Sequence, residues 1–249
     1  QKDSSEFVDE YQASANSIIW LDFADPNKTR EQIQQFQTLL SKLLPHDILK
    51  ITLNANPQSL YTSGQKDANG QRETKDFING KRLEKLVHRL GDFMPQDVLA
   101  DQMTGDGLPR ILIRALEFAA NQALEGRRRE NMYFQPLTSY AYSDSSHQML
   151  TLAGIILSRN ERSAFFRETQ IKKWKLATPH WGSYHEIMVP ALTAREKIFI
   201  DQLLPRKSSK EIHKKLKFQF DPSTQKSLII IENYKKFYRY YPSFHRVAL

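Results

Sequence analysis

Two apolar stretches on either side of an amphipathic helix constrain this chain more than any other feature. Ile18 to Leu21 is a continuous apolar run, which is typical of a strand buried on both faces. Asp25-Pro26 then predicts a helix start, because an N-cap side chain precedes a proline at the first helical position. A second apolar strand, Ile48 to Leu53, follows the helix. Residues 17–57 therefore predict a β-α-β unit with two adjacent, almost wholly buried parallel strands.

Polar side chains stand at the end of both predicted strands. Asp22 and Asp25 follow the first strand, and Asn54 and Asn56 follow the second. Ligands of open α/β sheets bind at the carboxyl ends of the strands, so we take Asp22, Asp25 and Asn54 as catalytic candidates and Asn56 as a substrate-binding candidate. A carboxylate there can orient a substrate hydroxyl, act as a base or bind a divalent cation. The alternatives are structural: Asp22 ends a strand, Asp25 caps a helix, and the asparagines form an Asx turn.

An antiparallel hairpin is predicted later in the chain. Residues 132–142 and 148–157 have the composition of two strands, and the residues between them are typical of a short turn. Tyr140, Asp144 and His147 lie near this turn and are further substrate-binding candidates. A histidine beside an aspartate is a candidate acid-base pair, although such residues are also common in ordinary turns.

The charge of the chain is unevenly distributed. Residues 159–249 contain 19 Lys and Arg against 8 Asp and Glu, whereas the rest of the chain is slightly acidic. We therefore expect two domains, a Rossmann-like half domain at 1–158 and a basic, aromatic-rich, mainly helical subdomain at 159–249. A basic surface of this kind indicates either an acidic partner, such as nucleic acid, or a solvated charged face. The candidate phosphate-binding residues are Lys172, Lys173, Lys175, Lys235, Lys236 and Arg239.

The composition excludes several classes of protein. The chain has no cysteine, which rules out disulfides and thiolate metal sites and fits a cytoplasmic protein. It contains no apolar run near the length of a membrane span. His180, His185 and His213 do not have metal-binding spacing, so we expect no metal site.

The order strand, helix, strand, helices and hairpin resembles the second half of a class I S-adenosylmethionine-dependent methyltransferase. Ile18 to Phe23 matches the fourth strand of that fold and Asp47 to Asn56 the fifth, while Tyr133 to Tyr142 and Gln148 to Leu157 match its final antiparallel pair. The runs Ile-Trp-Leu-Asp-Phe, Ile-Thr-Leu-Asn and Tyr-Arg-Tyr-Tyr-Pro are similar to an uncharacterised prokaryotic O-methyltransferase-like family. The resemblance implies a Rossmann-like, mostly parallel sheet with an antiparallel hairpin, and S-adenosylmethionine as cofactor.

One departure from this family pattern matters for function. Class I methyltransferases bind their cofactor through a glycine-rich turn after the first strand, and the 16 residues before Ser17 contain no glycine. Three strands with their crossovers also need more residues than these. We therefore expect the cofactor-binding strands to come from an upstream half or from a second chain.

Two functions remain open on this basis. The leading interpretation is an O-methyltransferase-like enzyme, which could also be a catalytically degenerate descendant. The alternative is a non-enzymatic binding subunit of a nucleic-acid-directed complex, for example a prokaryotic phage-defence system. A glycine-rich turn upstream of Ile18 would favour the enzyme.

Overall fold

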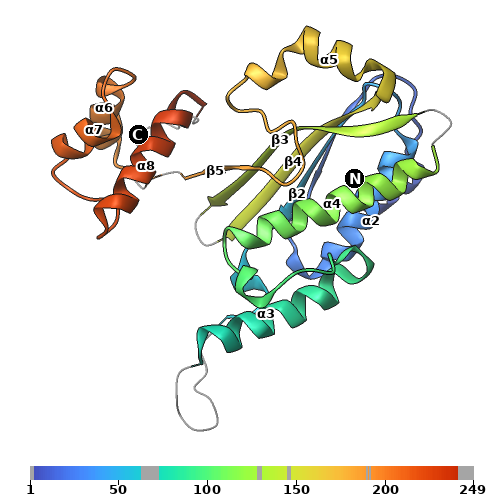
Figure 1. The fold of residues 1–249 in the computed structure, drawn as a ribbon, viewed down its shortest axis with the longest axis horizontal. Helices are drawn as coiled ribbons and strands as arrows, with labels where there is room; N and C mark the ends of the chain where they lie inside the picture. Colours follow the sequence, from blue (N-terminus) through green and yellow to red (C-terminus); the bar gives the residue numbers. More distant parts are fainter. Residues whose placement is uncertain are drawn as a thin grey trace, which may run out of the picture. The chain divides into compact units, whose positions relative to one another are not determined.

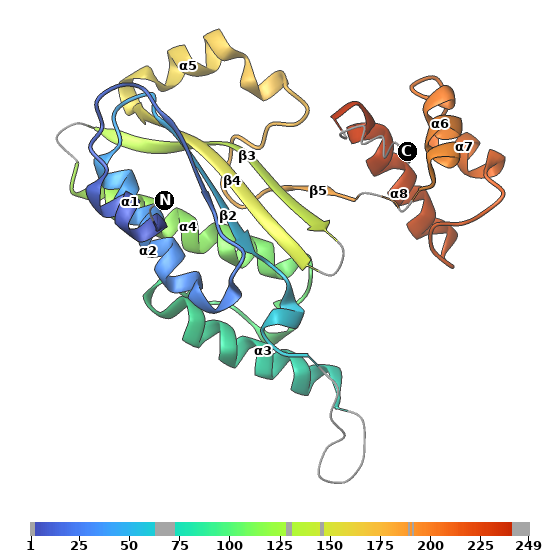
Figure 2. The same cartoon turned by 180° about the vertical axis from the view of Figure 1, so that it is seen from behind.

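The computed structural model describes residues 3–62, 73–127, 131–144, 147–188, 190 and 192–240. The chain divides into two compact units, Gln1–His185 and Glu186–Leu249, and each is described by itself. The first unit is an α/β unit and the second is mainly helical (Figures 1 and 2).

The first unit is organised on a mixed sheet. The strands are β1 (Ile18–Asp22), β2 (Ile48–Asn54), β3 (Met132–Asp144), β4 (His147–Ser158) and β5 (His185–Ile187), in the order β1-β2-β4-β3-β5. β1 to β4 lie within the first unit, and β5 begins at its last residue. β1 and β2 are parallel, whereas β2 with β4 and β3 with β4 pair antiparallel. The predicted β-α-β unit and hairpin are confirmed, and the parallel pairing among the described registers is confined to β1 and β2.

The helices of the first unit create its core on one face of the sheet. They are α1 (Ser4–Glu10), α2 (Thr29–Lys42), α3 (Lys75–Leu90) and α4 (Gly107–Glu125), whereas a further helix, α5 (Arg162–Thr169), buries none of its residues. α2 and α4 lie side by side along the sheet (Figure 1). Phe36 of α2 and Leu116 of α4 are completely buried, as are Leu49, Ile51 and Leu53 of β2. None of the described helices is long and apolar enough to cross a membrane.

β1 corrects one prediction from the sequence. Leu21 is only 4 % exposed, but Ile18 is 77 % exposed and Trp20 is 53 % exposed. β1 is the first strand in the sheet order, and alternate side chains leave the face that the helices cover. The Trp20 indole instead donates to Thr52 Oγ1 at 2.9 Å, and Lys50 Nζ lies 3.5 Å from the centre of its ring. The prediction of almost complete burial is therefore right for β2 and wrong for β1.

The first unit also extends further along the chain than the sequence suggested. Residues 159–185 belong to this compact unit, whereas the predicted domains divide at residue 159, and residues 176–179 bind to β3. The Thr178 amide donates to Leu137 O at 2.9 Å, and the Tyr140 hydroxyl donates to Leu176 O at 2.7 Å. These hydrogen bonds link the basic, aromatic segment to the hairpin. The compact units divide after this segment, at His185.

The second unit is a small helical core. It contains α6 (Ala194–Leu203), α7 (Ser209–Lys215) and α8 (Thr224–Phe237). Ile200, Ile212 and Ile231, one from each helix, are buried together. A capping box begins α6, since the Glu196 amide donates to Thr193 Oγ1 at 3.3 Å and the Thr193 amide donates to Glu196 Oε2 at 2.8 Å.

We expect Gly154→Ala to destabilise the first unit, because β4 passes close to β3 at this residue. An added Cβ would meet the Phe134 ring and lie 2.8 Å from Gln135 O, which is backbone and cannot easily move. Overpacking of this kind costs about 1–3 kcal/mol of unfolding free energy. The control is Gly80→Ala inside α3, where a Cβ would meet nothing within 4 Å and alanine favours the helix. Urea unfolding of both variants should give opposite signs, and equal stabilities would contradict the close packing at Gly154.

Candidate functional site

A pocket lies at the carboxyl ends of the parallel strands, where the sequence predicted a site. Its volume is about 500 Å³. It is lined by Ala24, Pro26, Asn54, Asn56, Gln58, Ser59, Thr62, His147 and Met149. The segments after β1 and β2 therefore meet the first residues of β4 here, because β4 runs antiparallel to β2 and begins beside its carboxyl end.

A second pocket adjoins the first and shares Asn56 and Gln58 with it. Its volume is about 510 Å³. Its other lining residues are Pro57, Arg82, Gly105, Ser143 and Gln148. We call these two hollows together the carboxyl-end pockets. They combine amide, hydroxyl, imidazole and guanidinium groups, which is a set suited to bind a polar ligand.

The two asparagines hold the loops that form the first pocket. Asn54 is only 8 % exposed, and its Oδ1 accepts the Asn56 amide at 3.0 Å while its Nδ2 donates to Ala24 O at 3.4 Å. Asn56 Oδ1 then accepts the Gln58 amide at 3.1 Å and starts the short helical turn Pro57–Ser59. Asn54 thus connects the end of β2 to the segment after β1, and the Asx turn considered from the sequence is present.

The two aspartates are placed differently from the asparagines. Asp25 Oδ1 accepts a hydrogen bond from the Asn27 amide at 2.9 Å and caps the turn Pro26–Lys28. This is the capping role that the sequence analysis gave as the alternative to catalysis. Asp22 is exposed and pairs in register with Thr52, on the face of the sheet that the helices leave open. Neither side chain is among those that line the carboxyl-end pockets. Burial lowers the pKa of the neighbouring Lys50, and the Asp22 carboxylate opposes that shift.

The three hairpin candidates are also separated. His147 lines the first pocket together with Asn54 and Asn56. Tyr140 binds the segment that returns to β3, and its ring lies 5.9 Å from the His185 ring. Asp144 ends β3, and its side chain lies outside the described part of the chain. Of the candidate residues, the structure therefore brings Asn54, Asn56 and His147 to one pocket.

Two arginines of α3 contribute to this site and were missed in the sequence. Arg89 is 8 % exposed, and its Nη2 donates to Asn27 Oδ1 at 2.7 Å and to Ser59 O at 2.9 Å. It therefore connects the loop after β1 to the loop after β2. Arg82 lines the second pocket and donates to Tyr61 O at 3.1 Å. Burial lowers the pKa of both guanidinium groups, and Asp25 opposes the shift at Arg89.

A signal for these arginines is present in the sequence. Arg82, Leu86 and Arg89 follow the spacing i, i+4, i+7, which places all three on one side of a helix. Because Leu86 is buried, the same side of α3 carries both arginines toward the protein.

The predicted phosphate-binding residues lie in two different units. Lys172, Lys173 and Lys175 are exposed in the first unit, whereas Lys235, Lys236 and Arg239 belong to the second. Lys235 Nζ donates to Lys207 O at 3.1 Å, and burial lowers the pKa of Lys236. A single phosphate-binding face made of all six residues stays a prediction.

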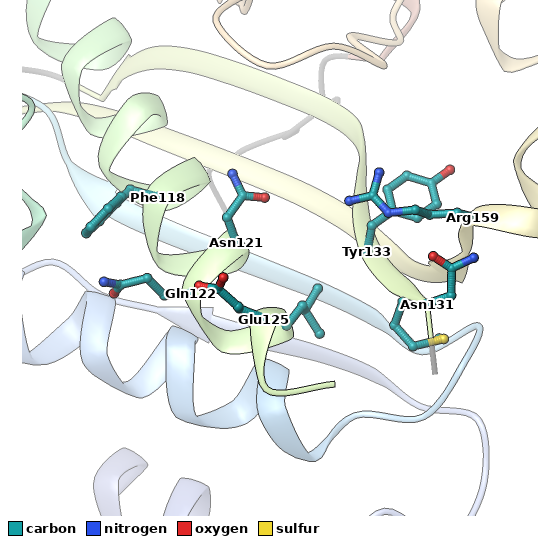
Figure 3. Close-up of a pocket in the computed structure, with 9 residues that line it drawn as sticks. Phe118, Asn121, Gln122, Glu125, Asn131, Tyr133 and Arg159 are labelled. Carbon is teal, nitrogen blue, oxygen red and sulfur yellow. The ribbon is translucent and has the colours of Figure 1, made fainter. Parts of the chain in front are cut away.

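A different pocket lies between the end of α4 and the start of β3. Figure 3 shows Asn121, Gln122 and Glu125 of α4 on one side and Asn131, Tyr133 and Arg159 on the other. Its volume is about 370 Å³, and the Arg159 guanidinium lies 5.5 Å from the centre of the Tyr133 ring. Burial raises the pKa of Tyr133, and the positive charges of the nearby Arg162 and Arg159 oppose that shift. We favour the carboxyl-end pockets as the functional site, because ligands of α/β sheets bind at that edge.

Among the described residues, no three histidine, aspartate or glutamate side chains gather in a way that could hold a metal ion.

The comparison with protein families decides the classification. The model of a family described as "Putative O-methyltransferase" matches residues 1–249. The chain belongs to this family. No curated protein matches the sequence. Family membership agrees with the arrangement of β1, β2 and the β3–β4 hairpin, which the sequence predicted from its resemblance to class I methyltransferases.

The described residues do not provide the cofactor-binding pattern of that fold. A glycine-rich turn would let the backbone approach the cofactor closely, yet the segments Phe23 to Pro26 and Ala55 to Pro57 after the described parallel strands contain no glycine. The carboxyl-end pockets therefore do not fit the S-adenosylmethionine pattern by themselves.

We expect Arg89→Met to destabilise the first unit and loosen the first pocket. Methionine fills similar space but leaves Ser59 O and Asn27 Oδ1 without their buried donor. Hydrogen bonds to a charged donor contribute about 1.5–3 kcal/mol, and their loss should lower the free energy of unfolding by a similar amount. The control is Lys85→Met on the exposed side of α3, which should change the free energy of unfolding far less. If urea unfolding gives both variants the same stability, Arg89 does not hold the two loops together.

Proposed function

We propose that the protein is an S-adenosylmethionine-dependent O-methyltransferase whose methyl acceptor binds in the carboxyl-end pockets. The observation that carries this proposal is the convergence of Asn54, Asn56 and His147 on one pocket at the ends of the parallel strands. Family membership supports the reaction type, and the position at the strand ends supports the location of the acceptor.

The chain's own residues would have two roles in this reaction. An acceptor hydroxyl loses its proton when its oxygen is methylated, and imidazole is the side chain that best takes up a proton near neutral pH. We assign that role to His147. Asn54 and Asn56 are positioning residues, since their amides fix the loop that carries Gln58 and Ser59. The Arg82 guanidinium beside the second pocket favours an acceptor that carries a negative or strongly polar group.

The cofactor would be held by further strands next to β1. The free edge of β1 supports this arrangement, because β1 has β2 on one side and no other neighbour in the described sheet. A strand added there in parallel would end beside Asp22 and the first pocket. Such strands could come from residues before this sequence or from a second chain.

Methyl transfer can be measured with S-adenosylmethionine labelled in its methyl group and a metabolite extract as the source of acceptors. The assay uses the protein purified from the cells that naturally produce it, together with any chain that is bound to it. Among O-methylated products, one that is stable to alkali is an ether, whereas release of methanol by alkali identifies a carboxyl ester. We expect His147→Ala to lower kcat about a hundredfold, as loss of a general base does. The control, His88→Ala on the exposed side of α3, should be fully active. Equal activity of both variants would exclude His147 as the base, and no transfer by wild type would contradict the proposed function.

Cofactor binding gives a second test. A ligand that binds only the native state raises the free energy of unfolding, by about 2.7 kcal/mol at a concentration of one hundred times Kd. We expect S-adenosylmethionine to leave the Tm of the isolated 249-residue chain unchanged, and to raise the Tm once the strands beside β1 are supplied. A saturable shift with the isolated chain would mean that its own residues hold the cofactor.

A further inference from the structure

The residues around α7 form a charged surface that the sequence analysis did not single out. Residues 206–217 contain six basic residues and one acidic residue, Glu211. Five of the basic side chains are exposed and have no ion pair with an acid among the described residues. They are Arg206, Lys210, Lys214, Lys215 and Lys217. We call these five residues the α7 cationic surface.

The fold of the second unit directs Lys210 and Lys214 away from its core. Ile212 is completely buried in the small core, so the opposite side of α7 faces away from that core. An α-helix turns by about 100° per residue, which places Lys210 and Lys214 almost directly opposite Ile212. The two lysines are also four residues apart and thus lie next to each other on the helix surface.

Glu211, the single acidic residue in residues 206–217, already has hydrogen-bond and ion-pair partners. The Ser208 amide donates to Glu211 Oε2 at 2.9 Å, and Lys207 Nζ lies 3.0 Å from Glu211 Oε1. These contacts, first the backbone hydrogen bond and then Lys207, lower the pKa of Glu211 to about 2. Glu211 therefore neutralises Lys207 and caps α7, and the five remaining charges have no ion pair with an acid in the part of the chain that the structure describes.

We propose that the α7 cationic surface binds the phosphate backbone of nucleic acid. Nucleic acid presents closely spaced negative charges, and lysines that neutralise phosphates release the counterions bound to them. Protein–nucleic-acid interfaces are polar and strongly positive, whereas lysine is depleted from protein–protein interfaces. No large hydrophobic side chain is exposed in residues 206–217, all of which the structure describes. These features favour nucleic acid over an acidic protein as the partner, whether or not the first unit transfers methyl groups.

The test compares two variants of the complete chain with the same change in charge. One is Lys210→Gln with Lys214→Gln and Lys215→Gln, since glutamine retains helix propensity. The control is Lys28→Gln with Lys75→Gln and Lys85→Gln, which removes three exposed lysines from the first unit. Fluorescence anisotropy then measures binding of a labelled DNA duplex, a single-stranded DNA and a single-stranded RNA of equal length at several salt concentrations.

We expect the wild type to bind nucleic acid with an affinity that falls steeply with salt. The α7 variant should bind more weakly to all sequences alike, with a slope of log K against log salt that is shallower by about 2 to 3 for three lost phosphate contacts. The control variant should keep the wild-type slope to within about 1. The ratio of affinities for the three probes then tells which form of nucleic acid the surface prefers.

Further controls separate charge from folding and from other partners. Replacing the same three α7 lysines by arginine retains the charge and should retain binding, while equal Tm values verify that each variant is folded. Three results would overturn the proposal: no binding by wild type to any probe at low salt, an equal loss in both glutamine variants, or equally tight binding of labelled polyglutamate. The last would assign the surface to an acidic protein.

Discussion

The pairing of β2 on both of its edges determines where every other part of the first unit lies. β2 is parallel to β1 on one edge and antiparallel to β4 on the other. Its alternate residues Leu49, Ile51 and Leu53 are completely buried, so a slip by one residue would remove all three from the core. The same register places Asn54 opposite Met149 and close to the start of β4. The first pocket therefore depends on the same register as the core, because the pairing that buries Leu49, Ile51 and Leu53 also brings Asn54 and His147 together.

The loops at that edge depend on charge as well as on the sheet. Arg89 is buried and Arg82 is partly buried, and both donate to backbone oxygens of the segment after β2. Taking a guanidinium group out of water is unfavourable unless its donors are used, and charge-assisted hydrogen bonds to carbonyl groups offset that cost. α3 thereby holds the segment after β2 at Tyr61 and at Ser59, and Ser59 lines the first pocket. A helix with an ordinary amphipathic pattern thus positions both halves of the site.

The sequence predicted the elements of the fold better than their surroundings. The β-α-β unit and the hairpin follow from local apolar patterns and side-chain hydrogen bonds, which depend on neighbouring residues. The burial of β1 does not follow from such patterns. Ile18 and Trp20 are exposed, because the described sheet places no strand on the outer edge of β1 and alternate side chains leave the face that the helices cover. An apolar run in the sequence does not indicate which elements will lie beside it. The same reason explains the domain boundary, which depends on Thr178 and Tyr140 binding partners far away in the chain.

The exposed edge of β1 has a consequence for association. Natural proteins protect edge strands with lysine, proline, bulges or a covering segment, because unpaired backbone groups invite another strand. β1 has none of the first three within Ile18–Asp22, and its register with β2 is regular throughout. Its single charged side chain, Asp22, stands at the end of the strand beside the pocket. An edge of this kind is suited to pair with a further strand, and parallel pairing would extend the same carboxyl-end edge at which Asn54 and His147 meet. The apolar side chains of β1 that contradicted the burial prediction thus provide the physical reason to expect the cofactor-binding strands on that side.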